Sequence, residues 1–160
     1  MIVRQSSFGF GAQVDASKFR VLVADDCAAN RRLFEVLYRS CGCSVTLAED
    51  GAEAMSAALS QHFDLICLDR HMPHVSGDEV AELVRTAYGR APRPFLVLST
   101  SDPRPGDAPY AFDAVLPKPF TPNDVAAVVA KAIHSAISGK GRSGRIGRPG
   151  GGSAAPAALS

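Results

Sequence analysis

Five side chains that can take part in chemistry follow apolar segments of the sequence. Asp25 and Asp26 follow "FRVLVA" (19–24), Asp69 follows "DLICL" (64–68), Ser99 ends "PFLVLS" (94–99), and Lys118 comes shortly after "DAVL" (113–116). If these segments are parallel strands of one open sheet, their carboxyl ends lie at the same edge, where such sheets bind ligands. We therefore expect three carboxylates, one hydroxyl and one ammonium group to line a single pocket.

Three neighbouring carboxylates repel one another, and a hard divalent cation is the usual means of neutralising them. Mg²⁺ is the natural candidate, because it prefers oxygen ligands and is commonly held by one or two carboxylates together with phosphate oxygens. One carboxylate could then attack phosphorus while the cation and Lys118 neutralise the phosphoryl oxygens. Asp69 is the best nucleophile, since it stands alone on its strand end.

The rest of the chain predicts the elements that would position these groups. The four segments above and "SVTLA" (44–48) alternate with stretches of helical period, which indicates an α/β fold with a parallel sheet. Three predicted helices begin with a capping side chain three residues before an acid, and the last has proline at its first position. These pairs are Asp50 with Glu53, Ser76 with Glu79, and Thr121 with Asp124, followed by an apolar stripe of Val125, Val128, Val129, Ala132 and Ile133.

Four motifs carry a family resemblance: "VLVADD", "LDRHMPHVSG", "LVLST" and "LPKPF". In this order and spacing, residues 19–138 resemble the receiver domain of bacterial two-component response regulators. The resemblance implies a flavodoxin-like, doubly wound sheet of five parallel strands in the order 2-1-3-4-5. It also implies a cis peptide bond before Pro119 and a loop glycine at Gly77.

The resemblance further implies a role for each site residue. Asp69 would be the phosphoacceptor, and Asp25, Asp26, Asp69 and the backbone carbonyl of His71 would bind Mg²⁺. Ser99 would donate a hydrogen bond to the phosphoryl group, and Lys118 would be its ion-pair partner.

The implied function is Mg²⁺-dependent phosphoryl transfer from a histidine kinase or a histidine phosphotransfer protein to Asp69, which switches the binding of a downstream protein. The chain would not be an enzyme beyond its own phosphorylation and dephosphorylation. It would act either alone or as the receiver of a hybrid kinase.

Two departures from the family pattern affect the predicted signalling surface. Val115 stands where receivers usually carry an aromatic residue that responds to phosphorylation. The prolines of "TSDPRPGDAPYAFDA" (100–114) oppose a regular helix between the fourth and fifth strands, so this helix should be short, irregular or absent. We expect this segment to be locally mobile and to be ordered by phosphorylation.

Each residue also has a simpler interpretation. Taken alone, Asp26 would be a helix cap, Ser99 a strand-end hydroxyl and Lys118 a solvated charge; their conjunction favours a site. His71 and His74 are expected to be exposed loop residues, Arg31 and Arg32 to face solvent or a partner, and Cys67 to lie in the core.

Two other functions stay open from the sequence. A haloacid-dehalogenase-like phosphatase also uses a strand-end aspartate, Mg²⁺ and a lysine, but that family places a second aspartate two residues from the nucleophile. A nucleic-acid-binding role would rest on a basic tail, and we consider it the weaker alternative.

Charge and composition define the regions outside the predicted domain. Residues 19–138 contain 11 Lys and Arg against 15 Asp and Glu, a net charge of −4, whereas residues 139–160 carry +4 and seven glycines. The latter are predicted to be a disordered basic tail, and residues 1–18 a short N-terminal extension. The four cysteines lack the spacing of a zinc site or disulfide framework, and no segment is typical of a membrane span or signal peptide. We therefore expect a cytoplasmic protein that does not contact a membrane.

Overall fold

A computed structural model of the protein describes residues 19–138, so the predicted N-terminal extension and basic tail lie outside the described residues. The fold is built on one parallel sheet with the strand order β2-β1-β3-β4-β5. Its strands are β1 (Arg20–Ala24), β2 (Ser44–Ala48), β3 (Leu65–Asp69), β4 (Phe95–Thr100) and β5 (Ala114–Pro117). The predicted flavodoxin-like topology is confirmed, and each strand lies within a residue or two of its predicted segment.

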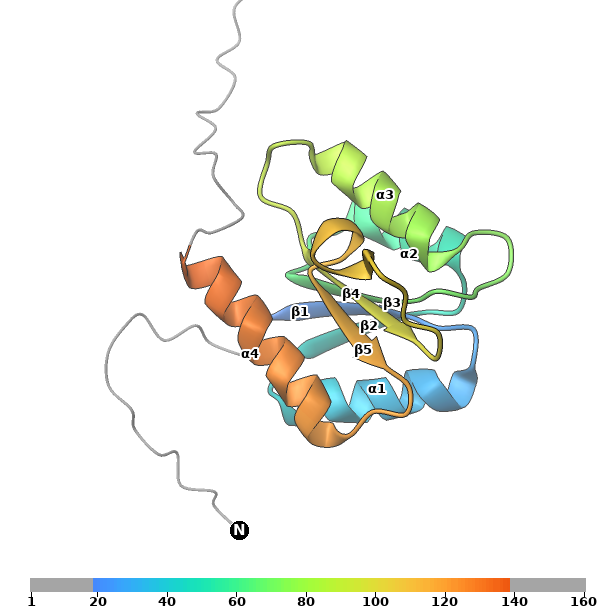
Figure 1. Ribbon diagram of the computed structural model, residues 1–160, viewed down its shortest axis with the longest axis vertical. Coiled ribbons are helices and arrows are strands. Elements are labelled where there is room, and N and C mark those ends of the chain that lie inside the picture. Colours follow the sequence, from blue (N-terminus) through green and yellow to red (C-terminus); the bar gives the residue numbers. More distant parts are fainter. Residues whose placement is uncertain (1–18, 139–160) are drawn as a thin grey trace, which may run out of the picture.

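Helices cover both faces of the sheet (Figure 1). The helices are α1 (Ala28–Ser40), α2 (Gly51–Ser60), α3 (Gly77–Tyr88) and α4 (Pro122–Ser138). α1 and α4 pack together on one face, and α2 and α3 pack together on the other. Within residues 19–138, no helix has the length and hydropathy needed to cross a membrane.

The sheet divides the core into two apolar clusters, because successive strand residues point to opposite faces. One cluster lies between the sheet and the helices α2 and α3, and β1 and β3 contribute Leu22, Ile66 and Leu68 to it. The other lies between the sheet and the helices α1 and α4, and the same two strands contribute Val21, Val23, Leu65 and Cys67. Both faces of β1 and β3 are therefore buried, which explains why their sequences are near-continuous apolar runs rather than alternating ones.

Side-chain caps fix the start of three helices as predicted. Asp50 accepts a hydrogen bond from the Glu53 N–H (2.8 Å), and Ser76 and Glu79 form a reciprocal capping box. The Thr121 hydroxyl oxygen accepts from the Asp124 N–H (3.3 Å). Each cap begins its helix directly after a loop at the carboxyl edge of the sheet, which fixes the length of those loops.

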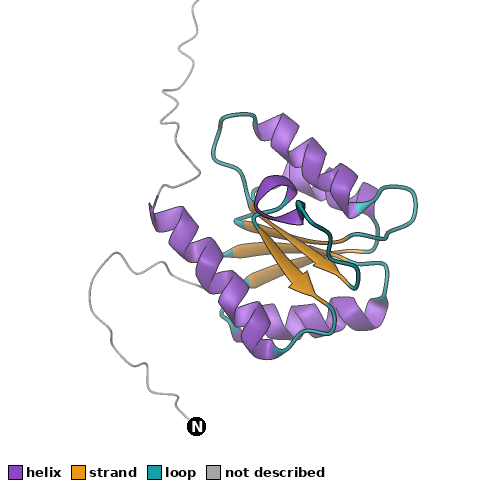
Figure 2. Ribbon diagram, in the orientation of Figure 1, coloured by secondary structure: helices purple, strands orange, loops and turns teal. Residues whose placement is uncertain are grey.

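The segment between β4 and β5 contains only one short helical turn, η2 (Asp107–Ala111), visible as the small purple coil in Figure 2. Even this turn is irregular, since Ala108 has extended backbone angles (φ −129°, ψ 144°). The predicted shortening of this helix is confirmed. The Lys118–Pro119 peptide is cis, as predicted, and so is Ala108–Pro109.

Candidate functional site

The register of the sheet brings the predicted site residues to one edge. Asp69 pairs with Ser99 between β3 and β4, and Asp25 follows Ala24, whose partner Leu68 precedes Asp69. On the far side, the Lys118 N–H donates to the Thr100 carbonyl at 2.8 Å. The side chains of three strand ends and one following loop therefore face a common pocket.

The three predicted acids form a cluster that could hold a metal ion. One carboxylate oxygen from each of Asp25, Asp26 and Asp69 lies within 4.8 Å of the other two. Asp25 and Asp69 are buried, whereas Asp26 is exposed, so the cluster is reached from solvent. An all-oxygen donor set of this kind, with room for water ligands, fits Mg²⁺ better than a softer metal.

Lys118 lies inside this cluster and bridges two of the acids. Its Nζ is 3.1 Å from Asp25 Oδ2 and 3.3 Å from Asp69 Oδ1. Burial lowers the pKa of Lys118, but the hydrogen bond to Asp25 and the charges of Asp25 and Asp69 outweigh burial and raise it above its ordinary value. The ammonium group therefore stays protonated in this pocket.

The Asp69 carboxylate lies in surroundings that disfavour its negative charge. Burial and the charge of Asp25 raise its pKa above the ordinary aspartate range, although Lys118 opposes them. A divalent cation between the acids would remove this penalty, because an opposite charge favours the ionised carboxylate. The electrostatics of the pocket thus agree with its donor set in favouring a cation.

The Ser99 hydroxyl lies beside the cluster without a hydrogen-bond partner within the described part of the chain. Its Oγ is fully buried, and Ser99 is the residue paired with Asp69 across the strands. A buried polar group without a partner costs about 1–3 kcal/mol. The hydroxyl is consequently available to a new acceptor that enters the pocket.

Cys27, Asn30 and Arg31 hold Asp25 in place, and the sequence pattern did not predict these contacts. Its carboxylate accepts from the Cys27 N–H (2.9 Å) and from Asn30 Nδ2 (3.2 Å). Arg31 Nη1 donates to the Asp25 carbonyl at 2.8 Å. Of the two orientations predicted for Arg31, towards solvent or towards a partner, the first was therefore wrong: only 14% of its side chain is exposed, against 77% for Arg32.

Gly77 allows the loop after β3 to fold back against the end of β3. A Cβ atom on Gly77 would lie 2.2 Å from the Asp69 carbonyl oxygen, and the Gly77 N–H donates to the Arg70 carbonyl at 3.1 Å. Only glycine fits this approach. His71 and His74, in the same loop, are exposed as predicted, and the His71 carbonyl as a metal ligand stays a prediction.

Comparison with known proteins agrees with this geometry. The family model of the response regulator receiver domain matches residues 21–130. Transcription factor SKN7 of Candida albicans is 31% identical over 123 residues, which cover 72% of this chain and 21% of that protein. Protein PilG of Pseudomonas aeruginosa is 28% identical over 119 residues, which cover 72% of this chain and 88% of PilG. The chain therefore matches most of the length of PilG but spans only about a fifth of the length of SKN7.

Among solved structures, the response regulator protein TrrA of Thermotoga maritima, in complex with Mg(2+)-BeF, has a similar fold. Its TM-score is 0.65 and its sequence identity 29%, over 72% of this chain and 99% of that one. The similar region corresponds in extent to the sheet and helices described above.

Proposed function

Since the chain belongs to the response regulator receiver family, we propose that a phosphohistidine donor phosphorylates Asp69 and that this modification switches the binding of a downstream protein. The observation that carries the proposal is the bridging position of Lys118 between Asp25 and Asp69, next to the unpartnered Ser99 hydroxyl. We assign the receiver to residues 19–138. The residue two positions after Asp69 is His71, so the second aspartate of the phosphatase alternative is not in place.

In the proposed reaction, a carboxylate oxygen of Asp69 attacks the phosphorus of the donor. The new P–O bond forms as the P–N bond breaks, and the electron pair of that bond returns to the imidazole nitrogen. Lys118 and Ser99 bind the phosphoryl oxygens. Mg²⁺, held by Asp25, Asp26, Asp69 and the His71 carbonyl, would neutralise the charge of the transferring group.

Intact-mass measurement after incubation with acetyl phosphate and Mg²⁺ tests this function. Wild type should gain one phosphoryl group that hydroxylamine removes, and Asp69→Asn should gain none. Glu82→Gln, which removes an acid from an exposed position of α3, is the matched control and should be labelled like wild type. Equal labelling of Asp69→Asn and wild type would reject Asp69 as the acceptor.

The surface beside the pocket supports docking of the donor. An open groove of about 340 Å³, lined by Asn30, Leu33, Ser101, Lys118, Pro119 and Phe120, adjoins the site. Next to it, α1 exposes apolar side chains at helical spacing, Leu33 (46% exposed) and Val36 (52%). Exposed apolar groups beside a reactive centre suit a partner that buries them while it presents its phosphohistidine.

Substitution of Leu33 separates donor docking from phosphoryl chemistry. Leu33→Asp should slow labelling by a phosphorylated histidine phosphotransfer protein about tenfold or more, because it places a charge at the buried interface. Labelling by acetyl phosphate should not change. Leu59→Asp is the control, at an apolar position on α2 that is also exposed (59%, against 46% for Leu33). If both variants slow transfer equally, the groove is not the docking site.

We also propose that the protein acts in the cytoplasm. The four cysteines, Cys27, Cys41, Cys43 and Cys67, all lie within the described residues and are all unpaired, as expected in a reducing compartment.

A further inference from the structure

Arg70 follows the proposed acceptor directly and has no part in the site described above. It is 3% exposed, and arginine is almost never buried to this extent without charged partners. No sequence pattern indicated a role for it.

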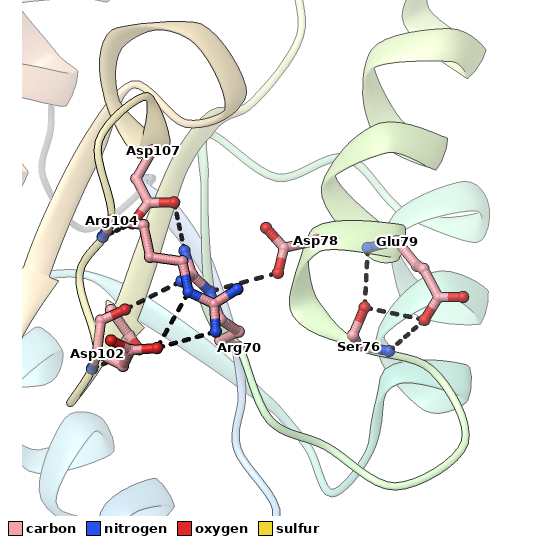
Figure 3. A network of polar contacts seen from close by, with 8 residues as sticks. Arg70, Ser76, Asp78, Glu79, Asp102, Arg104 and Asp107 are labelled. Carbon is pink, nitrogen blue, oxygen red and sulfur yellow. Dashed lines mark hydrogen bonds and ion pairs between the residues drawn. The ribbon is translucent and has the colours of Figure 1, made fainter.

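The Arg70 side chain joins three segments of the protein (Figure 3). Its Nη1 donates to the Asp102 carbonyl at 3.0 Å, and its Nη2 donates to the buried Asp107 carboxylate. Its Nε lies 3.4 Å from Asp78 Oδ2, at the start of α3. One side chain at the end of β3 thus holds both the start of the β4–β5 segment and its η2 turn, and it also contacts α3.

We propose that Arg70 is a positioning residue that couples the phosphorylation state of Asp69 to residues 101–111. The inference rests on the proposed function, since it requires a phosphoryl group on Asp69. It gives a physical route for signalling in a chain that has Val115 in place of the family's usual aromatic residue.

The coupling follows from two of the contacts that attach this segment to the rest of the fold. On one side, β4 leads into it through Ser99 and Thr100, whose Oγ1 accepts from the Asp102 N–H at 3.1 Å. On the other side, Arg70 attaches it to β3. Backbone pairing already places the end of β4 beside the end of β3, with Asp69 opposite Ser99. When the Ser99 hydroxyl binds a phosphoryl oxygen on Asp69, it adds a side-chain link between these two strand ends. Both attachments then belong to one rigid unit, and the segment between them opens less often.

Loss of Arg70 would remove only the second attachment. The phosphoryl group could still bind Ser99, but its effect would end near Thr100, because no side chain would connect β3 to Asp102 and Asp107. A merely structural role for Arg70 predicts something different: faster opening with and without the phosphoryl group, and an unchanged difference between the two states.

Amide hydrogen exchange with and without Mg²⁺ and beryllofluoride, a phosphoryl mimic, distinguishes these roles. In wild type, exchange across residues 101–111 should slow roughly fivefold on addition of the mimic, the factor equivalent to one hydrogen bond. In Arg70→Met the mimic should still bind, as monitored by fluorine NMR, but this slowing should disappear. Asp107→Ala removes the carboxylate that accepts from Arg70 Nη2, so the slowing across η2 should disappear in this variant as well, which keeps the test valid if Arg70→Met folds poorly.

Arg85→Ala is the matched control. Arg85 lies on α3 and donates to the Ala111 carbonyl, so its loss loosens the same segment without touching β3. This variant should exchange faster in both states and keep the fivefold difference. Slowing that persists across residues 101–111 in Arg70→Met, or across η2 in Asp107→Ala, would overturn the coupling alone. Binding of the mimic to wild type without any slowing would do the same. Failure of wild type to bind the mimic would overturn the proposed function as well.

Discussion

Replacement of Asp69 by asparagine should stabilise the protein in the absence of divalent cations, although it removes the central group of the site. Two charges 3.3 Å apart, the distance from Lys118 Nζ to Asp69 Oδ1, attract by about 5 kcal/mol at an effective dielectric constant of about 20. A like charge within 4.8 Å, such as Asp25, repels by about 3.5 kcal/mol or more. These two contributions largely cancel.

Two further contributions then determine whether Asp69→Asn raises or lowers the free energy of unfolding. Asp26 adds a second repulsion, and burial of the Asp69 carboxylate costs it hydration. We therefore expect Asp69→Asn to raise the free energy of unfolding by about 2 kcal/mol at pH 7 and low salt, or the melting temperature by about 6 °C. The direction agrees with the raised pKa of Asp69.

The pH dependence has a definite sign. Because the pKa of Asp69 is raised in the folded state, the folded protein takes up the proton more readily than the unfolded chain. The stabilisation of wild type that comes from protonation is fully present below the pKa of the unfolded state. It is lost as the pH rises through the folded-state pKa. The extra stability of Asp69→Asn over wild type should therefore shrink as the pH falls towards the pKa of an ordinary aspartate side chain.

Thermal unfolding by circular dichroism, with EDTA and then with Mg²⁺, measures both effects. Mg²⁺ should raise the melting temperature of wild type more than that of Asp69→Asn, because the variant lacks one ligand charge. Glu82→Gln should differ from wild type by no more than about 0.5 kcal/mol. An unchanged or lower melting temperature of Asp69→Asn in EDTA at pH 7 would show that the cluster is not under electrostatic strain.

Three other substitutions test the supports of the site. Lys118→Met should abolish labelling by acetyl phosphate and lower the free energy of unfolding by about 2 kcal/mol, since it leaves the buried Asp25 and Asp69 without their counter-charge. Intact mass measures the labelling and urea unfolding measures the stability, and full labelling would contradict the first expectation. Gly77→Ala should cost about 3 kcal/mol in urea unfolding, because its Cβ would overlap the Asp69 carbonyl, and a cost below about 1 kcal/mol would mean that the loop can move away. Ser76→Ala should cost about 1 kcal/mol through loss of the α3 cap, and retention of wild-type stability would show that Glu79 alone suffices there.

The sequence predicted those features that depend on local pattern or on the geometry common to parallel sheets. Apolar runs marked the strands, capping pairs marked three helix starts, and strand ends marked the convergence of Asp25, Asp69, Ser99 and Lys118. The prolines after β4 correctly excluded a regular helix. In each case the signal lies within a few residues or follows from the strand order.

Contacts that depend on side-chain reach could not be predicted in this way. Arg31 and Arg70 have charged side chains, and the ordinary expectation for such residues is exposure. The structure shows that each instead reaches a carbonyl from another segment, Asp25 for Arg31 and Asp102 for Arg70. The prolines showed that 100–114 is irregular but carried no information about the contacts that attach it to Arg70, and its local mobility stays a prediction. Asn30 gave one weak signal, a polar side chain in the first turn of α1 after an acidic pair.

The ammonium group that balances the charges of Asp25 and Asp69 comes late in the receiver domain. Lys118 lies 93 residues after Asp25 and directly follows β5. A ribosome-bound chain that has not yet exposed β5 therefore carries Asp25 and Asp69 without their counter-ion. Until β5 docks, the carboxylates of Asp25 and Asp69 repel each other without a counter-charge. Docking of β5 brings Lys118 to them and completes the pocket at the same time. Competence to accept phosphate would thus be acquired in the step in which β5 docks, and acetyl phosphate labelling of stalled chains would report when that step occurs.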